Sequence, residues 1–96
     1  MNRYTKQEKQ LACFAKAMGH PTRIAILKIL SSRNECFFGD IIKMLHISKS
    51  TISQHLSQLK NSGLIQGKII HPNVKYSINR ENWEQAKELF NELLNG

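Results

Sequence analysis

Apolar residues recur at helical spacing through the first part of the chain. A capping-box pattern, Thr5 with Glu8 three residues later, precedes a predicted helix over about 5–18. Pro21 suits the first position of a second helix, because its missing N–H would have no partner there. Residues 21–31 are apolar around most of the helical circumference, which is typical of a buried helix.

Two more helices follow, and a tight corner joins them. The apolar spacing predicts a short helix over about 38–45 and a longer one over 48–60, with residues 46–47 forming the corner. Ser48 is the expected N-cap of the longer helix, and Gly63 is expected just beyond its end.

The period then changes from helical to alternating. Residues 64–70 are a predicted strand, 71–73 a turn, and 74–78 alternate apolar with polar, which is typical of a half-buried strand. Asn79 is the expected N-cap of a last helix over about 80–94. The order α-α-α-α-β-β-α predicts a mainly α fold with a small β-hairpin, a winged helix-turn-helix.

Composition narrows the class of protein. The 96 residues are expected to form a single domain, 1–96, and the 41% apolar and 22% charged fractions are ordinary for a globular protein. No apolar run reaches the roughly 18 residues of a membrane span, and the polar start, residues 1–6, lacks a secretory signal. We therefore expect a cytoplasmic protein with no membrane partner and with reduced cysteines.

The charge is the most informative part of the composition. Fourteen Lys and Arg against seven Asp and Glu give a net charge of +7, and no acid occurs between Asp40 and Glu81. A basic domain favours a polyanionic partner, nucleic acid first and an anionic membrane surface second. A solvated basic surface without a ligand is the alternative.

The predicted helix 48–60 has one apolar and one polar side. At 100° per residue, Ile52, Leu56 and Leu59 share a side. The opposite side and its flanks carry hydroxyls and amides from Ser50, Thr51, Ser53, Gln54, Ser57, Gln58 and Asn61. Amides suit adenine edges, hydroxyls suit bases or phosphates, and lysines neutralise phosphates. This side is the predicted DNA-reading surface; a polar face with no ligand is the alternative.

The predicted hairpin offers a second basic surface. Lys68 and Lys75 fall on its strands, and His71 and Asn73 at its tip. Lys75 alternates away from the apolar positions, so we expect it to be exposed. Such a wing fits a phosphate backbone or minor groove, although it would also serve merely to cover the core.

Two segments resemble known motifs of one protein family. Residues 15–27, with the run Gly19-His20-Pro21-Thr22-Arg23, and residues 48–56, followed by Leu59, Gly63, Leu64 and Ile65, are similar to the two signature segments of the ArsR/SmtB (arsenic-repressor) family of bacterial transcriptional regulators. The resemblance spans about residues 11–78. It implies a cytoplasmic homodimeric repressor whose fourth helix enters the major groove, with Lys49, Ser50, Ser53, Gln54 and His55 touching DNA.

Together these arguments predict a regulator that binds duplex DNA sequence-specifically. The residues expected to contact DNA are Ser48, Lys49, Ser50, Thr51, Ser53, Gln54, His55, Ser57, Lys60, Lys68, His71 and Lys75. The apolar residues expected at a homodimer interface, on the terminal helices, are Leu11, Cys13, Phe14, Trp83, Phe90 and Leu93. A two-fold dimer would set its reading helices one DNA turn apart and predicts a near-palindromic operator.

The metal sites known in the resembled family do not carry over. Aligning Asp40 with the family's acid places Phe37 and Gly39 at the thiolate positions, and Cys36 is one residue out of register. Residues 81–96 contain no Asp, His or Cys, so the second family site has no ligands there. We predict no metal and no cofactor, and the isolated His20, His46 and His71 are not predicted as ligands.

Cys13 and Cys36 leave two interpretations open. The resemblance allows a thiol switch between an N-terminal and a third-helix cysteine across the dimer. The preferred interpretation is that both cysteines are small, buried apolar residues.

Two other functions were weighed against DNA binding. A winged-helix module that binds protein through the same face is the main alternative. An enzyme with a cysteine nucleophile is not predicted, because no base lies at an informative spacing from either thiol. The signal that would release DNA is not identified by the sequence.

Overall fold

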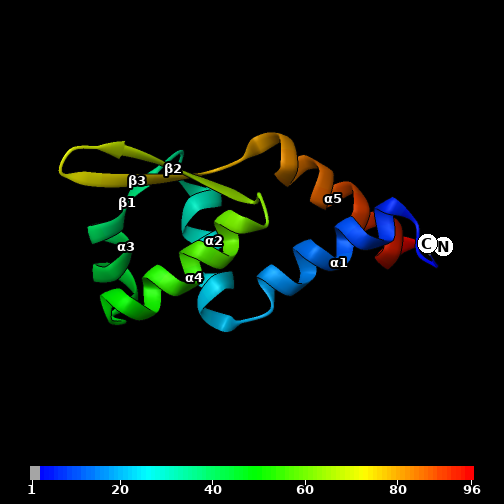
Figure 1. Cartoon of the computed structure of the whole chain (residues 1–96), viewed down its shortest axis with the longest axis horizontal. Coiled ribbons are helices and arrows are strands. Elements are labelled where there is room, and N and C mark those ends of the chain that lie inside the picture. The colour runs from blue at the N-terminus through cyan, green and yellow to red at the C-terminus, as the bar shows by residue number, and fades with distance from the viewer. Residues whose placement is uncertain (1–2) are drawn as a thin grey trace.

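The computed structural model describes residues 3–96, so Met1 and Asn2 lie outside the described residues. Its elements in chain order are α1 (Lys6–Met18), α2 (Pro21–Ser32), β1 (Cys36–Phe37), α3 (Phe38–Leu45), α4 (Lys49–Asn61), β2 (Ile65–Ile70), β3 (Asn73–Ile78) and α5 (Arg80–Asn95). The molecule is elongated, 45 × 23 × 23 Å, with α1 and α5 side by side at one end and the hairpin and α3 at the other (Figure 1). None of the helices described is long and apolar enough to cross a membrane.

The helix starts follow the capping signals in the sequence. The Thr5 hydroxyl accepts from the Glu8 N–H at 3.0 Å, and the Glu8 carboxylate accepts from the Thr5 N–H at 2.8 Å, which completes the predicted capping box. The Asn79 side chain accepts from the Asn82 N–H at 3.2 Å and so caps α5 as predicted. The predicted helix boundaries agree with the observed ones to within a residue or two.

The sheet has one strand more than the sequence predicted. β1 pairs with β3 through Cys36 opposite Tyr76 and Phe37 opposite Lys75, giving the antiparallel order β1-β3-β2. β1 is only two residues long, too short for alternation to reveal it. The consequence is that β3 is central and one end of the wing is anchored to the helical body.

One core connects the helices to the base of the wing. Its largest fully buried side chains are Phe14, Ile26, Leu30, Ile41, Ile52, Leu56, Leu59 and Leu64. Each such aliphatic side chain contributes roughly 1.5–3 kcal/mol by leaving water. Because these residues come from α1, α2, α3, α4 and the approach to β2, the core fixes the corner between α3 and α4 as well as the wing.

Gly63 marks the passage from α4 to the wing. Its φ is +86°, in the left-handed region that favours glycine, as the sequence predicted for a residue just past the helix end. The Asn82 amide donates to the Gly63 carbonyl at 2.8 Å. The Asn79 N–H donates to the Leu64 carbonyl at 2.9 Å, so the start of α5 is joined to the start of the wing.

Candidate nucleic-acid interface

The corner before α4 sets the direction in which this helix leaves the body. His46 ends α3 in the left-handed region, at φ 55°, and its N–H donates to the Ile42 carbonyl at 2.9 Å. Ser48 then caps α4: its hydroxyl accepts from the Thr51 N–H at 3.4 Å and donates to the Thr51 hydroxyl at 2.9 Å. The next helix therefore begins two residues after the corner, as in a helix-turn-helix.

One side of α4 is buried and the opposite side is exposed, as the sequence predicted. Ile52, Leu56 and Leu59 are at most 1% exposed and hold the helix against the core. The polar residues at Ser50, Ser53, Gln54, Ser57, Gln58 and Asn61 are all exposed, while Thr51 and His55 are half-buried. This outer face thus presents donors and acceptors, and it contains no acid.

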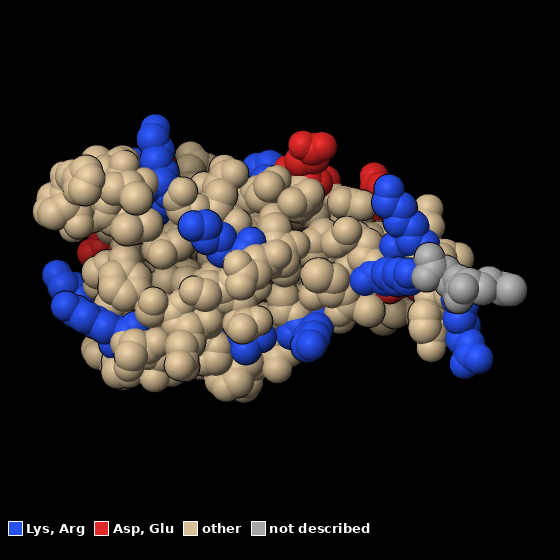
Figure 2. Space-filling model, viewed as in Figure 1, with Lys and Arg blue, Asp and Glu red and all other residues tan. Residues whose placement is uncertain are grey.

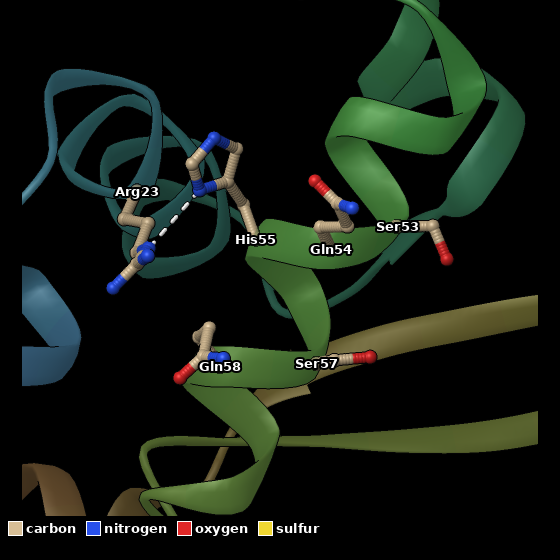
Figure 3. Close-up of a pocket in the computed structure, with 6 residues that line it drawn as sticks. All are labelled: Arg23, Ser53, Gln54, His55, Ser57 and Gln58. Carbon is tan, nitrogen blue, oxygen red and sulfur yellow. Dashed lines mark hydrogen bonds between the residues drawn. The ribbon is translucent and has the colours of Figure 1, made fainter.

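A hollow lies between α4 and the start of α2. Its volume is about 380 Å³. It is lined by Arg23, Ser53, Gln54, His55, Ser57 and Gln58. In Figure 3, Ser53 and Ser57 point to one side of α4, whereas His55 and Gln58 point to the other, toward Arg23. Ser53 and Ser57 therefore face a different edge of α4 from His55 and Gln58.

Arg23 and His55 are hydrogen-bonded to each other in this hollow. The Arg23 Nε–H donates to His55 Nδ1 at 3.0 Å (Figure 3). The His20 ring lies against the His55 ring with centroids 4.3 Å apart. Burial lowers the pKa of His55 below its ordinary value, and the nearby His20 and Arg23 lower it further. The lowered pKa favours the neutral form of the His55 ring, which lies at the edge of the polar face of α4.

The sequence argument missed this cluster. His20 is the N-cap of α2, because its Nδ1 accepts from the Thr22 N–H at 3.0 Å, a role that usually falls to Ser, Thr, Asp or Asn. Arg23 was treated only as part of a motif. The available signal was a basic side chain in the first turn of α2, where a positive charge opposes the helix dipole and so needs a compensating partner.

Positive charge gathers around α4. Lys49 and Lys60, at the two ends of α4, and Lys68 on β2 are exposed. In the space-filling view the lower edge, below α3 and α4, carries Lys and Arg without acids, while most of the acids visible lie toward α5 (Figure 2). Lysines and an acid-free edge therefore flank the polar face of α4, while further Lys and Arg lie at the opposite end of the molecule, beside α1 and α5 (Figure 2).

The expected exposure of Lys75 is wrong. Its ammonium donates to the Glu35 carboxylate at 2.9 Å and lies 5.3 Å from the centre of the Phe37 ring, and the side chain is 21% exposed. The cause is β1, the unpredicted strand, which places Phe37 opposite Lys75 and brings Glu35 into reach. Lys75 therefore anchors the wing to the body, whereas His71 and Asn73 lie exposed at its tip as predicted.

The terminal helices bear a partly open apolar surface. Leu11, Trp83 and Phe90 are half-buried, Leu93 is 64% exposed, and Leu94 is more exposed still. A hollow of about 290 Å³ opens beside Trp83, Phe90 and Leu94. Phe14 does not belong to this surface: it is 1% exposed inside the protomer's own core, so its predicted place at a dimer interface is wrong.

The two cysteines differ in environment. Cys36 is buried, and burial raises the pKa of its thiol, with a smaller contribution from Asp40. Cys13 is exposed, so the preferred interpretation of two buried thiols is wrong for this residue. Their elements, α1 and β1, lie in different halves of the molecule (Figure 1). Within residues 3–96, no three His, Cys, Asp or Glu side chains gather as a metal site would require.

These features define a class of protein. An exposed polar helix at a helix-turn-helix corner, surrounded by lysines and followed by an anchored β-wing, is the architecture of a winged helix-turn-helix DNA-binding regulator. Comparisons with known proteins give the family. Residues 20–66 match the family described as "Bacterial regulatory protein, arsR family".

Relatives extend this match over most of the chain. The HTH-type transcriptional regulator YgaV of Escherichia coli is 36% identical over 76% of this chain and 74% of its own length. The transcriptional repressor PagR of Bacillus anthracis is 31% identical over 81% of this chain and 78% of its length. The transcriptional activator HlyU of Vibrio cholerae is 30% identical over 92% of this chain and 81% of its length.

Solved structures agree with the sequence comparisons. The structure of Vibrio cholerae HlyU superposes with a TM-score of 0.76 at 27% identity, covering 97% of this chain and all of that one. The chain belongs to the ArsR family, and it is a DNA-binding transcriptional regulator. The resemblance noted in the sequence is thereby confirmed.

Proposed function

We propose that this chain, acting as one domain over residues 1–96, is a repressor that binds a near-palindromic operator as a homodimer. The exposed, acid-free face of α4 carries this proposal, because its amides and hydroxyls match the donor and acceptor pattern of the major groove. The helix N-terminus at Ser48 adds free N–H groups for a phosphate.

The residues of this surface divide by role. Ser50, Ser53, Gln54 and Ser57 are proposed to meet base edges, since they project from the exposed side of α4. The residues proposed to meet the backbone are Ser48, Lys49, Thr51, His55, Lys60, Lys68 and His71. Lys75 is left out of the direct contacts, because its ammonium is already paired with Glu35.

Dimerisation is proposed through α1 and α5. Leu93 and Leu94 project into solvent on a helix whose other apolar residues pack inward, and the hollow beside Trp83 and Phe90 continues the same surface. Covering these groups with a second copy would bury them by a two-fold contact. The start of α1 and the end of α5 lie together at this end of the molecule, away from the hairpin (Figure 1).

Selection from a random duplex pool tests the DNA proposal. Repeated capture of random 30-base-pair duplexes on the protein, followed by sequencing, should enrich an inverted repeat whose half-sites are centred about one helical turn apart. Fluorescence anisotropy on the enriched duplex and on a shuffled one measures the preference. No enrichment, and no retention of duplex at low salt, would favour the alternative of a protein-binding module.

Variants of α5 test the dimer independently of DNA. Leu93→Glu should produce monomers in sedimentation velocity and weaken binding to the inverted repeat, while the far-ultraviolet spectrum stays unchanged. Gln85→Glu, also on α5 but at an exposed polar position, is the matched control and should remain dimeric. A Leu93→Glu protein that sediments like the parent would contradict the proposed interface.

The direction of regulation needs a cellular measurement. PagR is named a repressor and HlyU an activator, so relatives of both kinds exist. A reporter with the enriched duplex overlapping its promoter should be silenced by the parent protein and not by Gln54→Ala. Increased reporter expression would exclude repression at that promoter.

A further inference from the structure

Arg23 joins three helices at one point. Its Nε–H donates to His55 Nδ1 on α4 at 3.0 Å. One of its terminal amino groups donates to the carbonyl oxygens of Ala17 at 3.2 Å and Lys16 at 3.4 Å, in the last turn of α1. The guanidinium therefore compensates the Ala17 carbonyl, which the end of α1 leaves without a helical partner, and shares the Lys16 carbonyl with the Gly19 N–H.

The contact with Arg23 also fixes the chemical state of His55. An Nδ1 that accepts a hydrogen bond carries no proton, so the ring is neutral with its proton on Nε2. The His20 ring, fixed by its own bond from the Thr22 N–H, lies against His55 at 4.3 Å. Among residues 3–96, no acid forms a hydrogen bond or ion pair with this cluster, and the charged group that faces it is Arg23.

The Nε2 of His55 is therefore presented as a donor beside the amides of the reading face. In Figure 3 this nitrogen points away from Arg23, on the side of the ring nearer Gln54 than Gln58. Because His55 lines the same hollow as Gln54 and Gln58, a DNA phosphate seated there would meet its N–H. Without this bond the ring could also take the tautomer whose Nε2 carries no proton, and that nitrogen would present an acceptor to the phosphate in place of a donor.

We propose that Arg23 is a positioning residue for DNA recognition, which acts by holding His55 in the rotamer and tautomer that donate to the DNA backbone. This role rests on the proposed function. It requires the forked geometry of the guanidinium, because Nε serves His55 while the terminal amino group serves α1. A lysine supplies the charge at one point only and cannot serve both partners.

Four variants separate positioning from a direct phosphate contact. They are Arg23→Lys, Arg23→Gln, His55→Phe and the double variant Arg23→Gln/His55→Phe. The control is Arg33→Lys, because Arg33 is an exposed arginine at the other end of α2. We expect Arg23→Lys and Arg23→Gln each to raise the Kd for the enriched duplex about tenfold. The double variant should bind about as weakly as His55→Phe alone, and Arg33→Lys should bind like the parent.

Two outcomes would overturn the positioning role. If Arg23→Lys keeps parental affinity, or if the losses from Arg23→Gln and His55→Phe multiply, Arg23 acts by charge and not through His55. Urea unfolding of each variant shows whether it is folded at the temperature of the titration. If Arg23→Gln is unfolded, the affinity of Arg23→Lys still decides whether Arg23 acts by charge alone.

Nitrogen-15 NMR of the free protein supplies a reading that does not depend on DNA. The parent should show His55 with a protonated Nε2 and a bare Nδ1, and Arg23→Gln should show a mixture of tautomers. An unchanged tautomer in Arg23→Gln would overturn the role of Arg23. Failure of the parent protein to bind any duplex would overturn the proposed function together with this one, while the tautomer measurement would still stand.

Discussion

The response of DNA binding to salt tests how the basic surface is used. Lys49, Lys60 and Lys68 are exposed and form no ion pair within residues 3–96, whereas Lys75 is paired with Glu35. A lysine that neutralises a phosphate releases a condensed counterion, so its contribution disappears as salt is added. Lys49, Lys60 and Lys68 should therefore each contribute to the salt dependence of DNA binding, and Lys75 should not.

The magnitude follows from the number of free lysines. Three per protomer give six in a dimer, and at about −0.9 per phosphate the slope of log K against log salt is about −5.4. Raising salt fourfold, from about 50 to 200 mM, should then weaken binding roughly 1,800-fold. Lys68→Met removes two of the six contacts, so the slope should become about −3.6 and the same change in salt should cost roughly 150-fold.

Fluorescence anisotropy at four or five salt concentrations measures these slopes. Lys75→Met is the matched control: it removes a lysine from the same hairpin, yet the slope should remain that of the parent because no phosphate contact is lost. A slope for Lys75→Met as shallow as that for Lys68→Met would refute the reasoning. It would mean that the bond to Glu35 opens when DNA binds.

Three further predictions concern the fold around the site. Gly63→Ala should lower the free energy of unfolding by about 1–2 kcal/mol in urea titrations, because its φ is +86° and a Cβ would lie 2.7 Å from the Asn82 amide nitrogen. Iodoacetamide should modify Cys13 rapidly and Cys36 only on unfolding, since Cys36 is buried and its thiol pKa is raised; intact-mass spectrometry follows both reactions. Because the pKa of His55 is lowered in the fold, the unfolded chain takes up a proton first as pH falls, so stability should decrease below about pH 6.5, and less so in His55→Phe.

Each of these has a clear contrary result. Gly39→Ala is the control for Gly63→Ala: nothing lies within 4 Å of its Cβ on α3, so it should be neutral or stabilise by about 0.5–1 kcal/mol, and equal losses at the two glycines would contradict the argument. Modification of Cys36 in the folded protein as fast as that of Cys13 would contradict the difference in burial between the two thiols. An identical pH dependence in His55→Phe would mean that other groups carry the proton uptake.

Local sequence signals predicted most of the fold and the polar face of α4, but not the contacts that hold this helix in place. The capping box at Thr5, the cap at Ser48 and the glycine at Gly63 are local, so neighbouring residues suffice to identify them. The division of α4 into a buried and an exposed side likewise follows from the 100° rotation per residue. These elements are where the predictions are confirmed.

The remaining parts depend on residues far apart in the sequence. Arg23 and His55 are separated by 32 positions, and Lys75 and Glu35 by 40, so no local pattern records that they meet. Strand β1 owes its existence to pairing with β3, and its two residues carry no period of their own.

The sequence by itself therefore determined which helix presents the exposed polar face that we propose reads DNA, since amphipathic spacing and capping are properties of neighbouring residues. Only the tertiary structure decided how that helix is held, which lysines remain free for phosphates, and that Phe14 belongs to the core. The physical reason is that hydrogen bonds, ion pairs and burial depend on distances in space, and these are set by the packing of the whole chain.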